Sequence, residues 1–371
     1  MRRLDSLRQR FAFAAVVWVV LVMPALVLSQ SGGQTQAGQT QPPPARPQEM
    51  QRVVLTSTFR PLPRKPIAEM VVPEPPFNKG TDAKNALGRR LFFDQNLSID
   101  RTVSCSTCHD PNRAFTDARP VAIGVGGQVG RRNSPTLINR GFGRVHFWDG
   151  RESSLEELVL QPIADPKEMG LPLPELRARL AADTSYREAF QSAFDGQVSV
   201  DTVGAALAAY LRTIRSGDSP YDRFSAGATD AMSDAAKAGF TIFRGKGQCA
   251  NCHREPLFTD EMLWNTSVAL RPDNTLADDG GSASFMTFGR TQTPPPLGAF
   301  KTPTLREVAR TAPYMHDGSM ATLTDVIEFY NQGGRSNAKG LVFIRPLNLS
   351  TEEKHALIAF LESLSGVVTG K

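Results

Sequence analysis

The sequence has few cysteines and few histidines, four and five among 371 residues. It also lacks any dense run of lysine and arginine with interleaved aromatic residues, the pattern typical of a surface that follows a phosphate backbone. The net charge of +5 is mild for a chain of this length. These absences argue against a nucleic-acid-binding protein. Hydrophobic residues at 40% and charged residues at 21% are instead typical of a soluble globular protein.

Convincing β-strand patterns are lacking as well. Apolar residues recur three or four positions apart over most of the chain after residue 150, which predicts amphipathic helices. Several of these segments begin with serine or threonine followed three residues later by a carboxylate, as Ser350 is by Glu353, and this pattern predicts helix N-termini. A length of 371 residues favours two domains. The sequence thus predicts a mainly α protein.

The N-terminal segment predicts export from the cytoplasm. Residues 1–10 contain four arginines, and residues 11–29 form an uncharged apolar stretch. Because no clear Ala-x-Ala cleavage site follows, residues 1–30 are either a signal peptide or an uncleaved membrane anchor. Either alternative predicts a periplasmic protein. Residues 31–75 are rich in glutamine, proline, glycine and threonine, which predicts a flexible linker before the first folded domain.

All four cysteines lie in two copies of one pattern, CSTCH at 105–109 and CANCH at 249–253. A Cys-x-x-Cys pair alone is compatible with a zinc site, a redox dithiol or a disulfide, but a histidine directly after both pairs favours covalent c-type haem. Two thioethers would attach the porphyrin to one turn of chain, and the histidine would bind the iron. The predicted attachment residues are Cys105, Cys108, Cys249 and Cys252, and the predicted iron ligands are His109 and His253.

The function depends on the sixth ligand of each iron. A c-type haem with two strong axial ligands transfers electrons, whereas a haem with an open axial position binds peroxide or oxygen. Three histidines remain after the two in the motifs, and several methionines in the second half could reach its haem. The residues alone leave these candidates open: His146, His316, His355, Met262, Met286, Met315 and Met320.

Several segments between residues 85 and 365 carry a more specific signal. They read GRRLFFDQNLS, CSTCHDPNRAFTD, RRNSPTLIN, FWDGR, PKEMG, CANCH, KTPTLREVARTAPYMHDGS and TLTDVIEFY. On these segments the chain resembles the bacterial di-haem cytochrome c peroxidases, and more closely their MauG-type relatives.

The resemblance implies two mostly helical, cytochrome c-like haem domains, packed together with the haem pair near their interface. They would occupy residues 76–222 and 223–371. The N-terminal haem would react with hydrogen peroxide, and the C-terminal haem would store and relay electrons. Trp148 of FWDGR matches the tryptophan that lies between the two haems in the family.

Two departures from the peroxidases point to the MauG-type branch. The peroxidases carry a histidine in the loop after the first motif, where it caps the N-terminal haem, but Val125 stands at the corresponding position here. They also bind the C-terminal haem iron with a methionine fourteen residues after the histidine of APYMH, a position that is Tyr330 in this sequence and tyrosine in MauG-type proteins. The resemblance therefore implies an open N-terminal haem and a Tyr330 ligand, although a lone tyrosine on a helix would otherwise read as a core residue.

The resemblance also assigns residues near the peroxide. Glu168 of PKEMG matches a carboxylate suited to moving a proton as the O–O bond breaks, and Pro162 matches a neighbouring residue of the same pocket. The glutamine of the family is replaced by Leu158, and Gln161 one turn later is a possible substitute.

A further set of matches concerns calcium. Asn133, Thr311 and Pro313 match the calcium site between the haems of the family, with oxygen ligands that suit a hard cation. Without the resemblance, these residues would read as turn formers. The predicted cofactors are therefore two haem c groups and calcium.

Three functions stay open on the sequence. The first is a MauG-like enzyme that uses hydrogen peroxide to oxidise a protein partner, with Trp148 coupling the haems. Because Gly247 stands where MauG has a surface tryptophan, that partner would differ from the partner of MauG. The second is a peroxidase that takes electrons from a small periplasmic cytochrome or copper protein. The third is an electron carrier with both irons saturated, for which His146 is the best candidate ligand.

Overall fold

The computed structural model describes residues 67–269, 298–334 and 344–371. The predicted signal or anchor at 1–30 and most of the predicted linker lie outside the described residues, as does Met286. Residues 67–75 of that linker are described, and Ile67 is buried beside strand β1 (Arg215–Gly217), where Arg215 donates a hydrogen bond to its carbonyl oxygen. Within the described residues, no helix combines the length and the apolar character needed to cross a bilayer.

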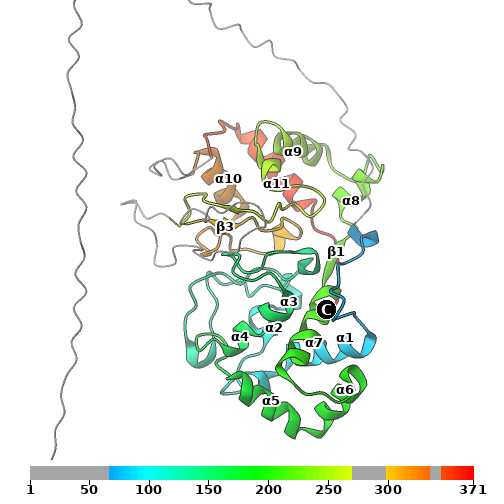
Figure 1. Ribbon diagram of the computed structural model, residues 1–371. Coiled ribbons are helices and arrows are strands. Elements are labelled where there is room, and N and C mark those ends of the chain that lie inside the picture. Colours follow the sequence, from blue (N-terminus) through cyan, green and yellow to red (C-terminus); the bar gives the residue numbers. More distant parts are fainter. Residues whose placement is uncertain (1–66, 270–297, 335–343) are drawn as a thin grey trace, which may run out of the picture. The chain divides into compact units, whose positions relative to one another are not determined.

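Helices dominate the described chain, as predicted (Figure 1). In the figure, β1 lies between a lower group of helices and an upper group. The lower group consists of α1 (Asp82–Phe93), α2 (Cys105–Cys108), α3 (Leu155–Leu158), α4 (Gln161–Ala164), α5 (Leu173–Ala182), α6 (Thr184–Phe194) and α7 (Val200–Thr213). The upper group consists of α8 (Pro220–Ser225), α9 (Asp234–Arg244), α10 (Leu323–Asn331) and α11 (Thr351–Glu362).

Short strands and 3-10 turns connect these helices. Strand β1 pairs antiparallel with β4 (Val367–Thr369), and β2 (Leu263–Trp264) pairs antiparallel with β3 (Phe300–Lys301). Each strand is only two or three residues long, which explains why no strand pattern is visible in the sequence. The 3-10 turns are η1 (Ile67–Glu69), η2 (Gln95–Leu97), η3 (Pro111–Arg113), η4 (Val125–Gly127), η5 (Arg140–Phe142), η6 (Cys249–Asn251) and η7 (Val308–Arg310).

The hydrophobic core has two clusters, one in each group of helices. Helices α1 and α7 pack together at the centre of the first cluster, and α9 and α11 at the centre of the second. Leu91, Phe92 and Leu207 are fully buried or nearly so in the first, as are Phe243 and Phe360 in the second. Each half therefore has its own apolar interior.

A glycine allows close helix contact at the centre of each cluster. A Cβ atom on Gly88 of α1 would lie 1.9 Å from the carbonyl oxygen of Ala206 in α7. A Cβ atom on Gly239 of α9 would lie 1.9 Å from the carbonyl oxygen of Ala356 in α11. The same contact thus occurs in both halves, and only glycine fits at either position.

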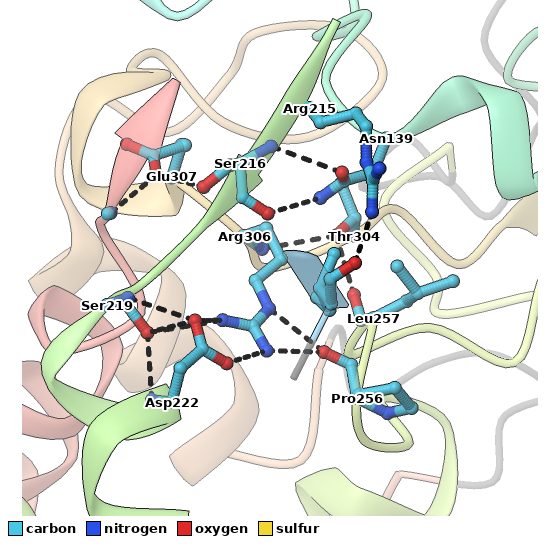
Figure 2. A network of polar contacts seen from close by, with 12 residues as sticks. Asn139, Arg215, Ser216, Ser219, Asp222, Pro256, Leu257, Thr304, Arg306 and Glu307 are labelled. Atoms are coloured by element: carbon cyan, nitrogen blue, oxygen red, sulfur yellow. Dashed lines mark hydrogen bonds and ion pairs between the residues drawn. The ribbon is translucent and has the colours of Figure 1, made fainter. Parts of the chain in front are cut away.

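The repeat extends to the connection between the halves. Asn139 and Glu307 occupy matching places after Pro-Thr-Leu, and both adopt left-handed backbone conformations with φ of 60° and 61°. Both reach Ser216 of β1 (Figure 2): the backbone N–H of Ser216 donates to Asn139 Oδ1 at 3.2 Å, and its hydroxyl donates to Glu307 Oε1. Strand β1 is therefore held from both halves.

The two halves also contact each other through matching positions. The backbone N–H of Asn133 donates to the carbonyl oxygen of His316 at 2.8 Å, and the N–H of Lys301 donates to the carbonyl oxygen of Trp148 at 2.7 Å. Asn133 and Lys301 each precede the threonine of Pro-Thr-Leu by three residues, and Trp148 and His316 each precede Asp-Gly. The contact is therefore reciprocal, like an isologous interface between two copies of one fold.

Candidate haem site

One large cavity connects the two cysteine motifs. Its volume is about 1490 Å³, and all four cysteines and both motif histidines line it. Sites for one small ligand usually have volumes of roughly 300–1,000 Å³. The cavity therefore leaves room for more than one such group, and the two motifs face a common space.

The first motif presents its histidine to this cavity. Cys105 and Cys108 form the single turn of α2, and His109 follows as its C-terminal cap. The Nδ1 atom of His109 lies 3.1 Å from the carbonyl oxygen of Phe115, which can only accept a hydrogen bond. Nδ1 therefore carries the proton, and Nε2 keeps the lone pair that a metal requires.

The second motif repeats this arrangement. His253 Nδ1 donates to the carbonyl oxygen of Phe258 at 3.0 Å. Phe115 and Phe258 are both fully buried, with φ of 58° and 54°. In each half, a threonine hydroxyl also donates to the carbonyl of the residue before the phenylalanine, at 2.6 Å from Thr136 and from Thr304. Both imidazoles are thus oriented by the same kind of hydrogen bond, from Nδ1 to the carbonyl oxygen of a buried phenylalanine.

The cysteines fit a covalent attachment. All four are free thiols. Burial raises the pKa of Cys105 and of Cys249 to about 12, and that of Cys108 and of Cys252 to about 11, so the thiols are neutral. No group of three or more His, Cys, Asp or Glu side chains that could hold a metal ion occurs in the described part of the chain. Two thiols beside an oriented imidazole are the donor set that c-type haem requires.

Glu168 lines the cavity beside the first motif and is partly buried. Burial and then the charge of Asp165 raise the pKa of Glu168 above its usual 4.5, while Arg151 opposes the rise. The loop that contains Val125 is bonded to the backbone of Glu168, because the Val125 N–H donates to the Glu168 carbonyl oxygen at 2.8 Å. A cavity-lining carboxyl group with a raised pKa is suited to proton transfer.

Gln161 is held in place from two sides. Its Oε1 accepts from Arg151 Nε at 3.0 Å, and its Nε2 donates to Glu152. Arg151 is in turn bound to Asp149 at 3.0 Å. Leu158 and Gln161 both line the cavity. Each polar atom of the Gln161 amide has one partner, which leaves a second N–H and a second oxygen lone pair for a ligand.

Trp148 lies where the halves meet. Its Nε1 donates to the carbonyl oxygen of Asn133 at 2.8 Å, and its own carbonyl oxygen accepts from Lys301 of the other half. His316, at the matching position, stacks on Phe300 with a ring separation of 3.6 Å. Trp148 therefore lines the common cavity with its ring fixed by a hydrogen bond.

Tyr330 and Pro162 occupy matching positions, each fourteen residues after His316 and Trp148 respectively. Tyr330 lies on α10 and lines the cavity, and Pro162 lies on α4 and lines it as well. Burial raises the pKa of the Tyr330 phenol, and the thiols of Cys249 and Cys252 raise it further. The phenol is therefore close to the second motif.

The comparisons with known proteins agree with this geometry. The family model described as di-haem cytochrome c peroxidase matches residues 82–230. The methylamine utilization protein MauG of Methylorubrum extorquens is 37% identical over 79% of this chain and 81% of its own length. The chain belongs to the di-haem cytochrome c peroxidase and MauG family.

Two further relatives represent both branches of this di-haem family. Cytochrome-c peroxidase IdrP2 of Denitromonas iodatirespirans is 36% identical over 76% of this chain and 81% of its own length. A crystal structure of a MauG-like protein associated with microbial copper homeostasis aligns with a TM-score of 0.70 and 34% identity, over 83% of this chain and 94% of that one. The chain is therefore a haem-dependent oxidoreductase of the peroxidase type, and its family implies two haem c groups as cofactors.

His146 is engaged in a way that disfavours iron binding. It is 1% exposed, and its Nδ1 lies 3.0 Å from Arg140 Nη2, which can only donate. Burial and the charge of Arg140 lower the pKa of His146 to about 3, so the ring is neutral and its remaining proton is on Nε2. Neither nitrogen then offers a free lone pair to a haem iron, which argues against the saturated electron carrier.

The three residues matched to calcium all line the cavity of the di-haem enzyme. The Asn133 amide nitrogen donates to the carbonyl oxygen of Arg119 at 2.8 Å, which leaves Oδ1 as its free acceptor. Thr311 Oγ1 donates to the carbonyl oxygen of Val308 at 3.1 Å. The three residues thus face a common cavity, and their role as calcium ligands stays a prediction.

Sequence reasoning missed the charged residues beside Trp148. Arg140 forms a 2.7 Å ion pair with Glu261 across the two halves, and Lys301 is buried nearby. An alignment of RRNSPTL with AFKTPTL would have placed Lys301 opposite Asn133 and flagged it as an interface position. No local pattern would have indicated the Arg140–Glu261 pair, because its members are far apart in sequence.

Proposed function

We propose that this di-haem protein is a MauG-like enzyme, which reacts with hydrogen peroxide at the haem of His109 and uses the oxidising equivalents of both haems on a protein partner. The observation that carries the proposal is Tyr330, whose phenol lies beside the second motif at the position where the peroxidases have methionine. Val125 supports it, since an aliphatic side chain cannot cap the first haem. We assign the two haem domains to residues 76–222 and 223–371. Two separate core clusters support a division into two domains, with Tyr221 already in the second cluster and Val368 packed against the first.

The haem iron supplies the peroxide-binding site and the one-electron chemistry. His109 would hold the haem iron through Nε2, because its Nδ1 donates to the Phe115 carbonyl oxygen. The Glu168 carboxylate would accept a proton from bound hydrogen peroxide and return it to the leaving oxygen. Pro162 lines the same cavity and would limit the space beside the peroxide without offering an N–H donor. Gln161 would help to orient the peroxide while its Oε1 stays bonded to Arg151.

Trp148 couples the two haems in this proposal. Its indole is held at Asn133, and its backbone is bonded to Lys301 of the other half. An aromatic ring held in this way at the interface would provide a fixed path for electrons between the two haem groups. Calcium at Asn133, Thr311 and Pro313 would hold the same interface, because the three residues come from both halves.

The partner and the location are part of the proposal. Gly247 lies two residues before Cys249, where MauG has a surface tryptophan, so the partner surface here differs from that of MauG. The apolar segment at residues 11–29 supports export to the periplasm, with the segment cleaved or kept as an anchor.

The experiment that tests the function is the addition of stoichiometric hydrogen peroxide to the fully oxidised, calcium-loaded holoprotein without an electron donor. We expect both ferric haem signals in the EPR spectrum to fall promptly and to return slowly. If the signals change only after one haem has been reduced, the N-terminal haem has a capping ligand. The protein would then be a peroxidase that takes electrons from a small periplasmic cytochrome or copper protein.

The Tyr330 ligand is tested by Tyr330→Met. We expect a changed absorbance spectrum and a higher midpoint potential for the C-terminal haem, because a thioether ligand favours reduced iron. Phe329→Met on the same helix is the matched control, since it adds the same side chain beside Tyr330 without replacing the phenol. Equal spectra for the wild type and Tyr330→Met would exclude Tyr330 as a ligand.

A further inference from the structure

A cluster of ionisable side chains is buried at the interface beside Trp148. It consists of Arg140 and His146 from the first half and Glu261 and Lys301 from the second. His146 and Lys301 are 1% and 8% exposed, and three of the four line the cavity: Arg140, His146 and Lys301. The roles proposed above for the haem ligands and for Glu168 do not explain why these four ionisable groups lie together.

Three members of this cluster satisfy one another. Arg140 Nη1 binds Glu261 Oε1 at 2.7 Å, and Arg140 Nη2 donates to the carbonyl oxygen of Val145 at 2.6 Å and to His146 Nδ1 at 3.0 Å. The second oxygen of Glu261 accepts from the backbone N–H of Arg144 at 2.6 Å. Both carboxylate oxygens of Glu261 therefore already have hydrogen-bond partners, one in the Arg140 side chain and one in the backbone of Arg144.

Two hydrogen-bond donors of the cluster, Lys301 Nζ and His146 Nε2, take no part in these contacts. The Lys301 ammonium makes one hydrogen bond among the described residues, to the carbonyl oxygen of Thr302 at 3.3 Å, and forms no ion pair with them. His146 Nε2–H has no acceptor in the part of the chain that the structure describes. Burial and the charge of Arg140 lower the pKa of Lys301 to about 7, so the site as it stands disfavours its charged form. Buried donors of this kind usually have an acceptor, and a buried ammonium usually has an anion.

We propose that Lys301 and His146 form a carboxylate-binding subsite for a haem propionate at the interface between the halves. The haem groups are the carboxylate-bearing ligands that this cavity takes in a di-haem protein, and a propionate would accept from both donors. The subsite would also connect a cofactor to the backbone of Trp148, because Lys301 N–H donates to the Trp148 carbonyl. The proposal rests on the two haem groups of the family and not on the peroxide chemistry.

The test is an isotope-edited infrared redox difference spectrum of the holoprotein. Cells fed aminolevulinate labelled at its carboxyl carbon produce haem labelled at the propionate carboxyl groups, so bands that shift with the label belong to propionates. In Lys301→Met we expect at least one such band to move or to be replaced by a band of the protonated acid. Lys301→Arg keeps a charged donor and should leave a carboxylate band.

Lys246→Met is the matched control. Lys246 lies three residues before Cys249, pairs with Glu353 at 2.6 Å and does not line the cavity, so its loss removes a charge near the same haem without removing the subsite. We expect its labelled bands to match those of the wild type. Labelled bands in Lys301→Met that equal those of the wild type would overturn the proposal.

Two further outcomes also decide the question. If Lys301→Met does not incorporate haem, His146→Phe is measured in its place. A labelled propionate band shifted from the wild-type position supports the subsite, and unchanged bands overturn the proposal. If the propionate bands do not respond but chloride or phosphate changes the spectrum only when Lys301 is present, the subsite binds a solvent anion and the proposal is wrong. Because no peroxide is added, a failure here does not bear on the peroxide reaction.

Discussion

Glu168→Gln should lower the rate constant for the reaction with hydrogen peroxide by about 10²–10⁴-fold, the usual contribution of a positioned acid–base group. Glutamine has nearly the same shape as glutamate but cannot accept the peroxide proton. The binding of haem should be unchanged, because the Glu168 side chain makes no hydrogen bond or ion pair within the described residues and its backbone hydrogen bond with Val125 is kept. Stopped-flow absorbance at limiting peroxide measures the effect.

The pH dependence of the same reaction should locate the group. The pKa of Glu168 is raised above 4.5 by burial, so the carboxylate that accepts the proton is lost at a higher pH than for an exposed glutamate. The rate should therefore fall as the pH decreases through this raised pKa. This acidic limb should be absent in Glu168→Gln.

Glu188→Gln is the matched control for both measurements. Glu188 is an exposed residue of α6 in the same half and does not line the cavity. We expect the control to keep the wild-type rate and its acidic limb. A Glu168→Gln protein that retained both would show that another group transfers the proton.

Gly239→Ala should destabilise the protein by about 3 kcal/mol or more, at the upper end of the cost of overpacking. The added methyl group would lie 1.9 Å from the carbonyl oxygen of Ala356 and 2.8 Å from Phe360 Cβ. The atom met first belongs to the backbone of α11, so the clash is relieved only if the two helices separate. Separation would expose Phe240 and Phe360, which are buried between them.

The free energy of unfolding of the holoprotein in guanidinium chloride tests this prediction. Ala238→Val is the control, because it adds two methyl groups at an exposed position of the same helix. Gly88→Ala should behave like Gly239→Ala, since its methyl group would meet Ala206 in the same way. Unfolding free energies within about 1 kcal/mol of the wild type would show that the helices can move apart at little cost.

Much of the site could be predicted from the sequence because its signals are local. The CSTCH and CANCH motifs place two thiols and an imidazole on a single turn, and the spacing alone indicates covalent haem. The amphipathic periodicity predicts the helices, since each helix buries one face. Tyr330 could be found by counting from His316, and the structure places its phenol beside the second motif.

Other features were invisible because they depend on contacts between distant segments. Glu168 would read as a solvated loop charge, and only the cover provided by neighbouring chain raises its pKa. Likewise, His146 was a candidate ligand until the contact with Arg140 occupied its Nδ1. Burial and hydrogen-bond partners depend on how distant segments pack together, so no local sequence pattern predicts them.

The sequence by itself determined the chemistry that the protein can hold: two haem attachment motifs, a tyrosine in place of a methionine and a mainly helical chain. Only the tertiary structure decided that both motifs face one cavity and that the halves meet through reciprocal contacts of Asn133 with His316 and of Lys301 with Trp148. The physical reason is that ligand type follows from side-chain identity and local spacing. The relative position of two haem sites follows instead from how two separate cores pack together.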